Sequence, residues 1–126
     1  MRRLLIQPIE ALPTRANTLY PNSLRYLERV IKSGKPLLPT IVIEDEEGLL
    51  TGDGNHRLTL ALQMRIRIAT DLIEIGDKYT FPDGVTRLLE PRYFSCVRAF
   101  RAIALTKGWK TFQDLLNDTP YFQQST

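Results

Sequence analysis

The feature that most constrains the fold is an apolar, β-branched run followed closely by a glycine-rich turn. Residues 40–43 read Thr-Ile-Val-Ile, a composition typical of a buried strand. A polar turn at 45–48, followed by Leu49, Leu50 and Thr51, predicts a return strand and hence a hairpin. The segment Gly52-Asp53-Gly54-Asn55-His56-Arg57 follows, and strong helix formers come after it. The sequence therefore predicts a strand that passes through glycines directly into a core helix.

Capping and turn residues delimit the other elements. Asn22 or Ser23 is suited to cap a helix, Gly34 to end it, and Pro91 to open another in its first turn. We expect a strand over 4–9, which Pro8 limits to an edge or a strand end, and a second strand within 66–75. We expect helices over 22–34, 90–108 and 111–117. A loop over 12–21, turns at 76–77 and 82–84, and frayed residues 119–126 complete the prediction. For the helix that begins near Pro91, the expected apolar stripe is Phe94, Val97, Phe100, Ile103 and Ala104, with Arg98 and Arg101 facing away.

This order of elements predicts an α+β fold with a small mixed sheet and packed helices. A length of 126 residues fits one domain over 1–126, with a core over 4–76 and a helical C-terminal third over 85–118. The basic and apolar N-terminus is interrupted by Gln7 and Pro8, too early for a secretory signal. No apolar run approaches the ~20 residues of a membrane helix, and Cys96 is the single cysteine. We therefore expect a cytoplasmic protein with no membrane partner.

Charge is unevenly distributed along the chain. Residues 41–84 carry nine acidic groups against four basic ones, whereas residues 85–110 carry six basic groups against Glu90 alone. A basic C-terminal third is able to attract DNA or an acidic protein. The alternative interpretation is that these cations are solvated positions on helices.

Residues 52–57 have the features of an anion site. The first N–H groups of a helix have no partner within the helix, and they share the positive end of the helix dipole. Gly52 and Gly54 allow a phosphate to approach the backbone, Asn55 or Asp53 is placed to cap the helix, and Arg57 adds a bidentate donor.

Two further residues of this segment are candidates for catalysis. His56, the only histidine, is a candidate general acid or base near neutral pH, with a structural role as the alternative. Asp53 is a candidate ligand for Mg²⁺ in the presence of phosphate oxygens, with an ordinary Asp-Gly turn as the alternative.

Residues 6–75 resemble the ParB/sulfiredoxin-like domain family. The resemblance is carried by an initial strand with "PIEAL", by Pro13-Thr14-Arg15, by a helix that ends in glycine, by a P-x-x-V strand from Pro39, and by the Gly-rich arginine motif at 52–57. The resemblance implies a fold in which this motif contacts nucleotide phosphates. Carried over, Gly52, Asp53, Gly54, Asn55, His56 and Arg57 would surround the phosphates of a nucleoside di- or triphosphate, and Arg15 would reach in from the first loop.

The departures from this family are informative. Sulfiredoxins carry a reactive cysteine where this chain has Asn55, so sulfinic-acid reductase activity is not expected. No ENxxR-like segment is found, and the chain ends too soon for the helix-turn-helix and dimerisation regions of partition-type ParB proteins. Kinase-type members share the DGxHR pattern, but the loop over 15–22 holds no acidic residue to serve as their base.

Two hypotheses of different class result. In the first, the chain binds a nucleoside phosphate through residues 52–57 and Arg15, and supports hydrolysis or phosphoryl transfer with Asp53 and His56 as catalytic residues. In the second, it is a non-catalytic DNA- or protein-binding module of a plasmid, phage or defence-type system that uses the basic C-terminal third. A nuclease activity has only Asp53 and His56 in its favour.

Overall fold

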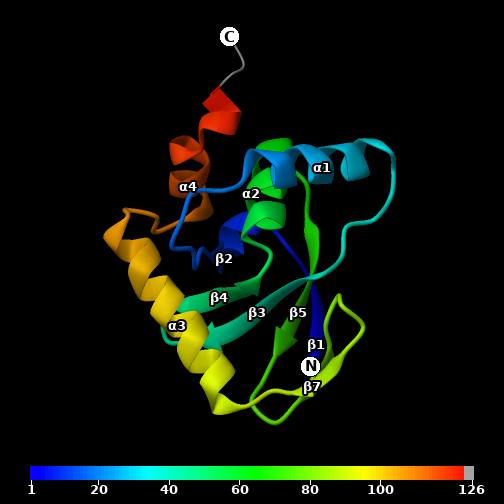
Figure 1. Ribbon diagram of the computed structural model, residues 1–126, viewed down its shortest axis with the longest axis vertical. Helices are drawn as coiled ribbons and strands as arrows, with labels where there is room; N and C mark the ends of the chain where they lie inside the picture. The colour runs from blue at the N-terminus through cyan, green and yellow to red at the C-terminus, as the bar shows by residue number, and fades with distance from the viewer. Residues whose placement is uncertain (124–126) are drawn as a thin grey trace.

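The computed structural model describes residues 1–123 and has a five-stranded mixed sheet at its centre (Figure 1). The strand order is β1 (Arg2–Ile6), β5 (Ile68–Ile73), β3 (Thr40–Asp45), β4 (Gly48–Asp53) and β2 (Ala11–Leu12). The central β3 pairs parallel to β5 and antiparallel to β4, while β1 forms an edge antiparallel to β5. The α+β class with a mixed sheet is therefore confirmed, as is the hairpin that leads to the glycines.

In the described part of the chain, four α-helices pack around the sheet: α1 (Pro21–Lys32), α2 (Asn55–Met64), α3 (Pro91–Thr106) and α4 (Phe112–Asp118). Side chains alternate along β3, so that Val42 faces one core while Ile41 and Ile43 face the other. Leu24, Leu58 and Phe112 bring α1, α2 and α4 to the Val42 face. The opposite face packs against α3, which runs along the side of the molecule in Figure 1.

Several expected boundaries are corrected. The first strand stops at Ile6 because Pro8 begins a 3-10 turn (Pro8–Glu10), and β2 follows it. Helix α1 begins at Pro21 with Tyr20 as its cap residue, so neither Asn22 nor Ser23 caps it. Gly34 and Gly108 have positive φ angles of 80° and 81° just beyond their helices, as expected.

The segment between β5 and α3 holds a hairpin that the sequence did not predict. Strands β6 (Lys78–Thr80) and β7 (Thr86–Leu88) pair antiparallel around the 82–84 turn. Residues 86–88 are thus a strand, so the expected helical segment over 85–118 begins too early. A short 3-10 helix (Pro120–Gln123) replaces the expected fraying up to residue 123, and residues 124–126 of that prediction lie outside the described residues.

Helix α3 buries an arginine that was expected to face solvent. Phe94, Val97, Arg101 and Ala104 form its buried stripe, at helical spacing, whereas Phe100 and Ile103 are exposed. The Arg101 guanidinium donates to Glu47 and to the carbonyls of Pro13, Trp109 and Lys110, at distances of 3.0–3.1 Å for the carbonyls. Burial of this charge is possible because these acceptors replace water.

Within residues 1–123, no helix combines the length and the apolar character needed to cross a membrane.

Replacing Arg101 by alanine should lower the free energy of unfolding by about 3 kcal/mol, because three carbonyls and Glu47 lose their donor. Arg98→Ala is the matched control, since Arg98 lies on the same helix and pairs with Asp45 of the same hairpin at the surface. It should cost less than about 1 kcal/mol. Urea denaturation measures both, and equal losses would contradict the structural role of Arg101.

Candidate functional site

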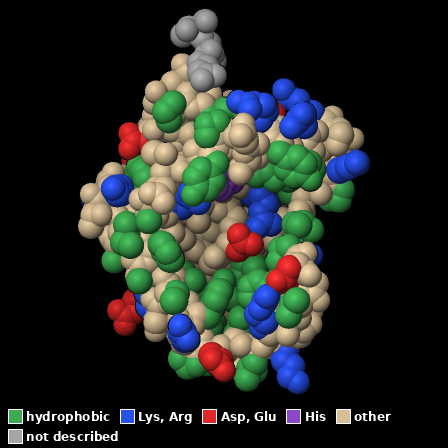
Figure 2. Space-filling model, in the orientation of Figure 1, with side chains coloured by type: hydrophobic (Ala, Val, Ile, Leu, Met, Phe, Trp, Pro, Cys, Tyr) green, Lys and Arg blue, Asp and Glu red, His purple; other side chains and the backbone are tan. Residues whose placement is uncertain are grey.

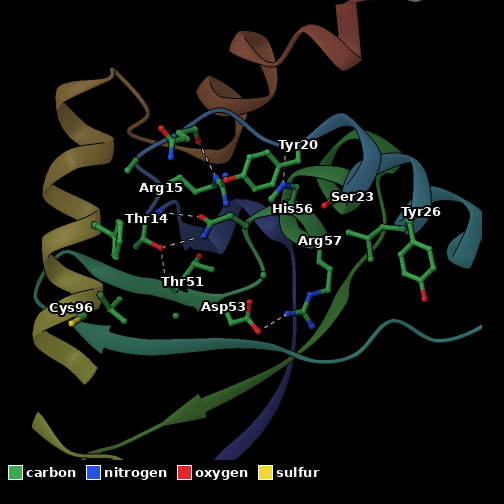
Figure 3. A pocket seen from close by; sticks show the side chains of 18 of the residues that line it. Thr14, Arg15, Tyr20, Ser23, Tyr26, Thr51, Asp53, His56, Arg57 and Cys96 are labelled. Carbon is green, nitrogen blue, oxygen red and sulfur yellow. Dashed lines mark hydrogen bonds and ion pairs between the residues drawn. The ribbon is translucent and has the colours of Figure 1, made fainter. Parts of the chain in front are cut away.

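A cleft of about 890 Å³ lies where β4 passes into α2. Its walls are the loop before α1, the first half of α1, the β4–α2 turn and one face of α3 (Figure 3). In the space-filling view the hollow is near the centre of the face, with the chain's one histidine at its edge (Figure 2). The structure brings all seven predicted site residues to this cleft: Arg15, Gly52, Asp53, Gly54, Asn55, His56 and Arg57.

The glycines of the turn are required by packing within the protein. A side chain at Gly52 would collide with the Tyr93 hydroxyl, and one at Gly54 would lie 2.5 Å from the Thr40 methyl carbon. Gly54 also has a φ angle of 123° and is itself the cap residue of α2, without a side-chain cap hydrogen bond. The expectation that Asn55 or Asp53 caps this helix is therefore wrong.

Arg57 is mostly buried, with 9% of its surface exposed. One terminal nitrogen, Nη1, donates to the carbonyls of Leu38 and Pro39, both at 2.7 Å. The other, Nη2, lies 3.2 Å from a carboxylate oxygen of Asp53 (Figure 3). The guanidinium thus forms part of the cleft wall, and its role as a free bidentate phosphate donor is not supported by this geometry.

Asp53 presents its carboxylate to the cleft. Half of its side chain is exposed, and the Arg57 pair occupies one oxygen. It is the only carboxylate among the residues that line the cleft. Over the described part of the chain, no group of three or more His, Cys, Asp or Glu side chains is arranged to hold a metal ion. Asp53 therefore fits Mg²⁺ only as one ligand beside oxygens of a bound phosphate.

His56 is held as a neutral ring. Its Nε2 atom accepts a hydrogen bond of 2.9 Å from the backbone N–H of Tyr20, and the two rings stack at a centroid distance of 5.5 Å. Burial, together with the nearby Arg15 charge, lowers the pKa of His56 to about 4. The predicted role as an acid or base near neutral pH is therefore corrected: the imidazole anchors the loop before α1.

Asn55 has a similar anchoring role. Its Oδ1 atom accepts from the Thr14 backbone N–H at 3.0 Å, and the Thr14 hydroxyl donates to the Thr51 carbonyl. These bonds tie the loop to the end of β4 and the start of α2. Asn55 is thus committed to the scaffold, although it lines the cleft.

Arg15 is the cation of the loop that faces the cleft. It donates to the carbonyls of Asn17 at 2.9 Å and Thr18 at 3.1 Å, and its guanidinium lies 5.0 Å from the centre of the Tyr20 ring. Carbonyl partners leave its charge uncompensated, in contrast to Arg57. The loop therefore fixes a positive charge at the cleft before any ligand arrives.

One face of α3 completes the cleft and was missed by sequence reasoning. Tyr93, Cys96, Val97 and Phe100 line it at helical spacing. From the sequence, Val97 and Phe100 were expected on the apolar stripe of this helix, and no residue of the helix was assigned to a site. The Tyr93 hydroxyl is buried and has no hydrogen-bond partner among residues 1–123. Burial, with the Asp53 charge, raises the pKa of Tyr93 to about 12, so its proton is retained.

Three of the four arginines in residues 85–110 are paired with carboxylates. Arg98 pairs with Asp45 at 3.0 Å and Arg101 with Glu47, while Arg87 pairs with Asp83 at 2.7 Å. The partners of Arg98 and Arg101 are both carboxylates of the β3–β4 hairpin. The geometry thus weakens that hypothesis.

Comparison with known proteins gives no match: no family model, no curated protein and no solved structure matches the chain. The ParB/sulfiredoxin-like resemblance therefore remains a prediction from the sequence motifs.

The lowered pKa of His56 predicts a pH dependence of stability. Because the folded chain holds this ring neutral down to about pH 4, only the unfolded chain takes up its proton between pH 6.5 and pH 4. The stabilising contribution is complete above pH 6.5 and is lost as the pH falls. When the pH is lowered from 7 to 5, the free energy of unfolding of wild type should fall by about 1 to 2 kcal/mol more than that of His56→Gln, after allowance for solvent screening. Urea unfolding at both pH values measures this, and identical losses in the two proteins would refute it.

The contact between Gly52 and Tyr93 predicts a coupled pair of substitutions. Gly52→Ala should lower the free energy of unfolding by about 1–3 kcal/mol, since the new methyl group would collide with the Tyr93 hydroxyl. Tyr93→Phe alone should be neutral or stabilising, because it removes a buried hydroxyl without a partner. The double variant should recover most of the loss. Thermal denaturation of wild type, the two single variants and the double variant tests this as a double-mutant cycle. If the effects of the two substitutions on stability simply add, the collision is not with the Tyr93 hydroxyl.

Proposed function

We propose that this chain binds a nucleoside phosphate in the cleft between α1, α3 and the start of α2. The observation that carries the proposal is the convergence, in one cleft, of a helix N-terminus, an uncompensated arginine and exposed aromatic rings. The volume of about 890 Å³ is in the range of small-molecule sites. This function agrees with the first hypothesis from the sequence, with different residues in the leading roles.

The negative charge of the ligand is assigned to the α2 end of the cleft. The backbone N–H groups of residues 55–57 are in the first turn of α2. They point along the helix axis beyond its N-terminal end, where the positive end of the helix dipole lies. Arg15 supplies a full charge that its carbonyl partners hold in position. Arg57 adds a second positive charge behind the turn, and Asp53 neutralises this charge in part. A phosphate at this end receives charge-assisted hydrogen bonds at little cost in ordering the protein.

The base of the ligand is assigned to the aromatic walls. Tyr26 on α1 is 61% exposed and Phe100 on α3 is 47% exposed, and both line the cleft. Exposed rings of this kind offer flat apolar surfaces on which a base stacks. A site with both an anion end and aromatic walls favours a nucleotide over an inorganic anion.

Binding is the part of the first hypothesis that the geometry favours most. Asp53 would hold Mg²⁺ together with the phosphates, and the metal would supply charge neutralisation there. His56 cannot supply a general base while its accepting nitrogen is bonded to Tyr20. Hydrolysis or phosphoryl transfer is therefore not part of the proposal.

Calorimetric titration with ATP, ADP and CTP, with and without Mg²⁺, tests the proposal. At least one nucleotide should bind, and Arg15→Ala should weaken it by about tenfold or more because a charged hydrogen-bond donor is lost. Arg67→Ala is the matched control, since Arg67 is exposed and does not line the cleft. The absence of heat with all three nucleotides, or equal affinity in wild type and Arg15→Ala, would exclude this function.

A further inference from the structure

A second cavity adjoins the cleft on the far side of Arg57. It has a volume of about 680 Å³ and lies between the second half of α1 and the segment over 35–38. Three residues, Tyr26, Leu27 and Arg57, line both cavities. The two hollows are therefore neighbours along one side of α1, and we refer to the pair of cavities as the groove.

Both cavities of the groove have cationic side chains in their lining. Arg29 and Lys35 are exposed and line the second cavity, which has no carboxylate among its lining residues. Arg15 and Arg57 line the first cavity, where Asp53 is the one opposing charge. Lys and Arg side chains also lie along α1 in the space-filling view (Figure 2). Such a groove is complementary to a chain of several phosphates rather than to one.

The length of the groove exceeds that of one nucleotide. Its lining residues run along α1 from Asn22 to Ser33, the residue that directly follows the last turn of the helix. At 1.5 Å per residue the rise from Asn22 to Ser33 is about 17 Å, which corresponds to about five nucleotides at the stacked spacing of about 3.4 Å. Tyr26, with its exposed ring, lines both cavities.

We infer that the groove binds a single strand of nucleic acid of about five nucleotides, with one phosphate at the start of α2 and the following backbone along Arg29 and Lys35. This inference rests on the proposed function and names its ligand class. A positive groove with an exposed aromatic ring is the arrangement by which proteins hold single strands without reading their sequence. Affinity should therefore be sensitive to salt and tolerant of base sequence.

Fluorescence anisotropy at low salt tests the inference, with competition by 5′-phosphorylated thymidine, by 5′-phosphorylated strands of five deoxythymidines or five uridines, and by a 12-base-pair duplex. At least one pentamer should bind at least tenfold more tightly than the mononucleotide, and more tightly than the duplex. Arg29→Glu and Lys35→Glu should each weaken the pentamer at least fivefold and leave the mononucleotide unchanged. Lys32→Glu is the matched control on α1, because Lys32 pairs with Glu28 and does not line the groove.

The outcomes separate this inference from the function on which it rests. If the mononucleotide binds and neither pentamer binds more tightly, the inference is overturned and the nucleotide site stands. If neither the mononucleotide nor either pentamer binds, the single-strand inference is overturned, and the titration with ATP, ADP and CTP decides whether the nucleotide site stands. A duplex that binds as tightly as the pentamers, or pentamer binding unchanged by Arg29→Glu and Lys35→Glu, also overturns the single-strand inference.

Discussion

The Arg57 guanidinium is the contact on which the site depends. It joins the segment that leads into β3, through the Leu38 and Pro39 carbonyls, to the turn that leaves β4, through Asp53. The two carbonyls are neutral, and they accept from Nη1 without cancelling the charge of the guanidinium. Asp53, which is half-exposed, cancels that charge only in part. The same residue therefore fixes the strand–turn–helix unit and leaves a positive potential behind the first turn of α2.

Around this contact, the polar residues of the cleft divide into anchors and ligand-facing groups. Asn55 and His56 hold the loop before α1 through the backbone N–H groups of Thr14 and Tyr20. That loop in turn holds Arg15 at the cleft. A site built in this way is ordered before its ligand arrives, which reduces the entropy lost on binding.

The sequence predicted the strand–glycine–helix unit and the part of the cleft that this unit forms, because β-branched runs, glycines and helix formers act locally. It did not predict the roles of Arg57 and His56, since their partners, Leu38, Pro39 and Tyr20, are 18 to 36 residues away along the chain. Arg101 was assigned to the surface because charge outweighed helical spacing, and Glu47, its compensating partner, is 54 residues distant. The missed β6–β7 hairpin has only three residues in each strand, too few for a recognisable alternation.

The most direct measurement of the central claim is the change in backbone amide NMR shifts as a nucleoside triphosphate is added to the intact chain. The account predicts saturable shifts of the amides of residues 54–57 and of Arg15, since the phosphates would accept from the first turn of α2 beside this guanidinium. Shifts confined to other surfaces, or none at millimolar nucleotide, would contradict an anion site at the start of this helix.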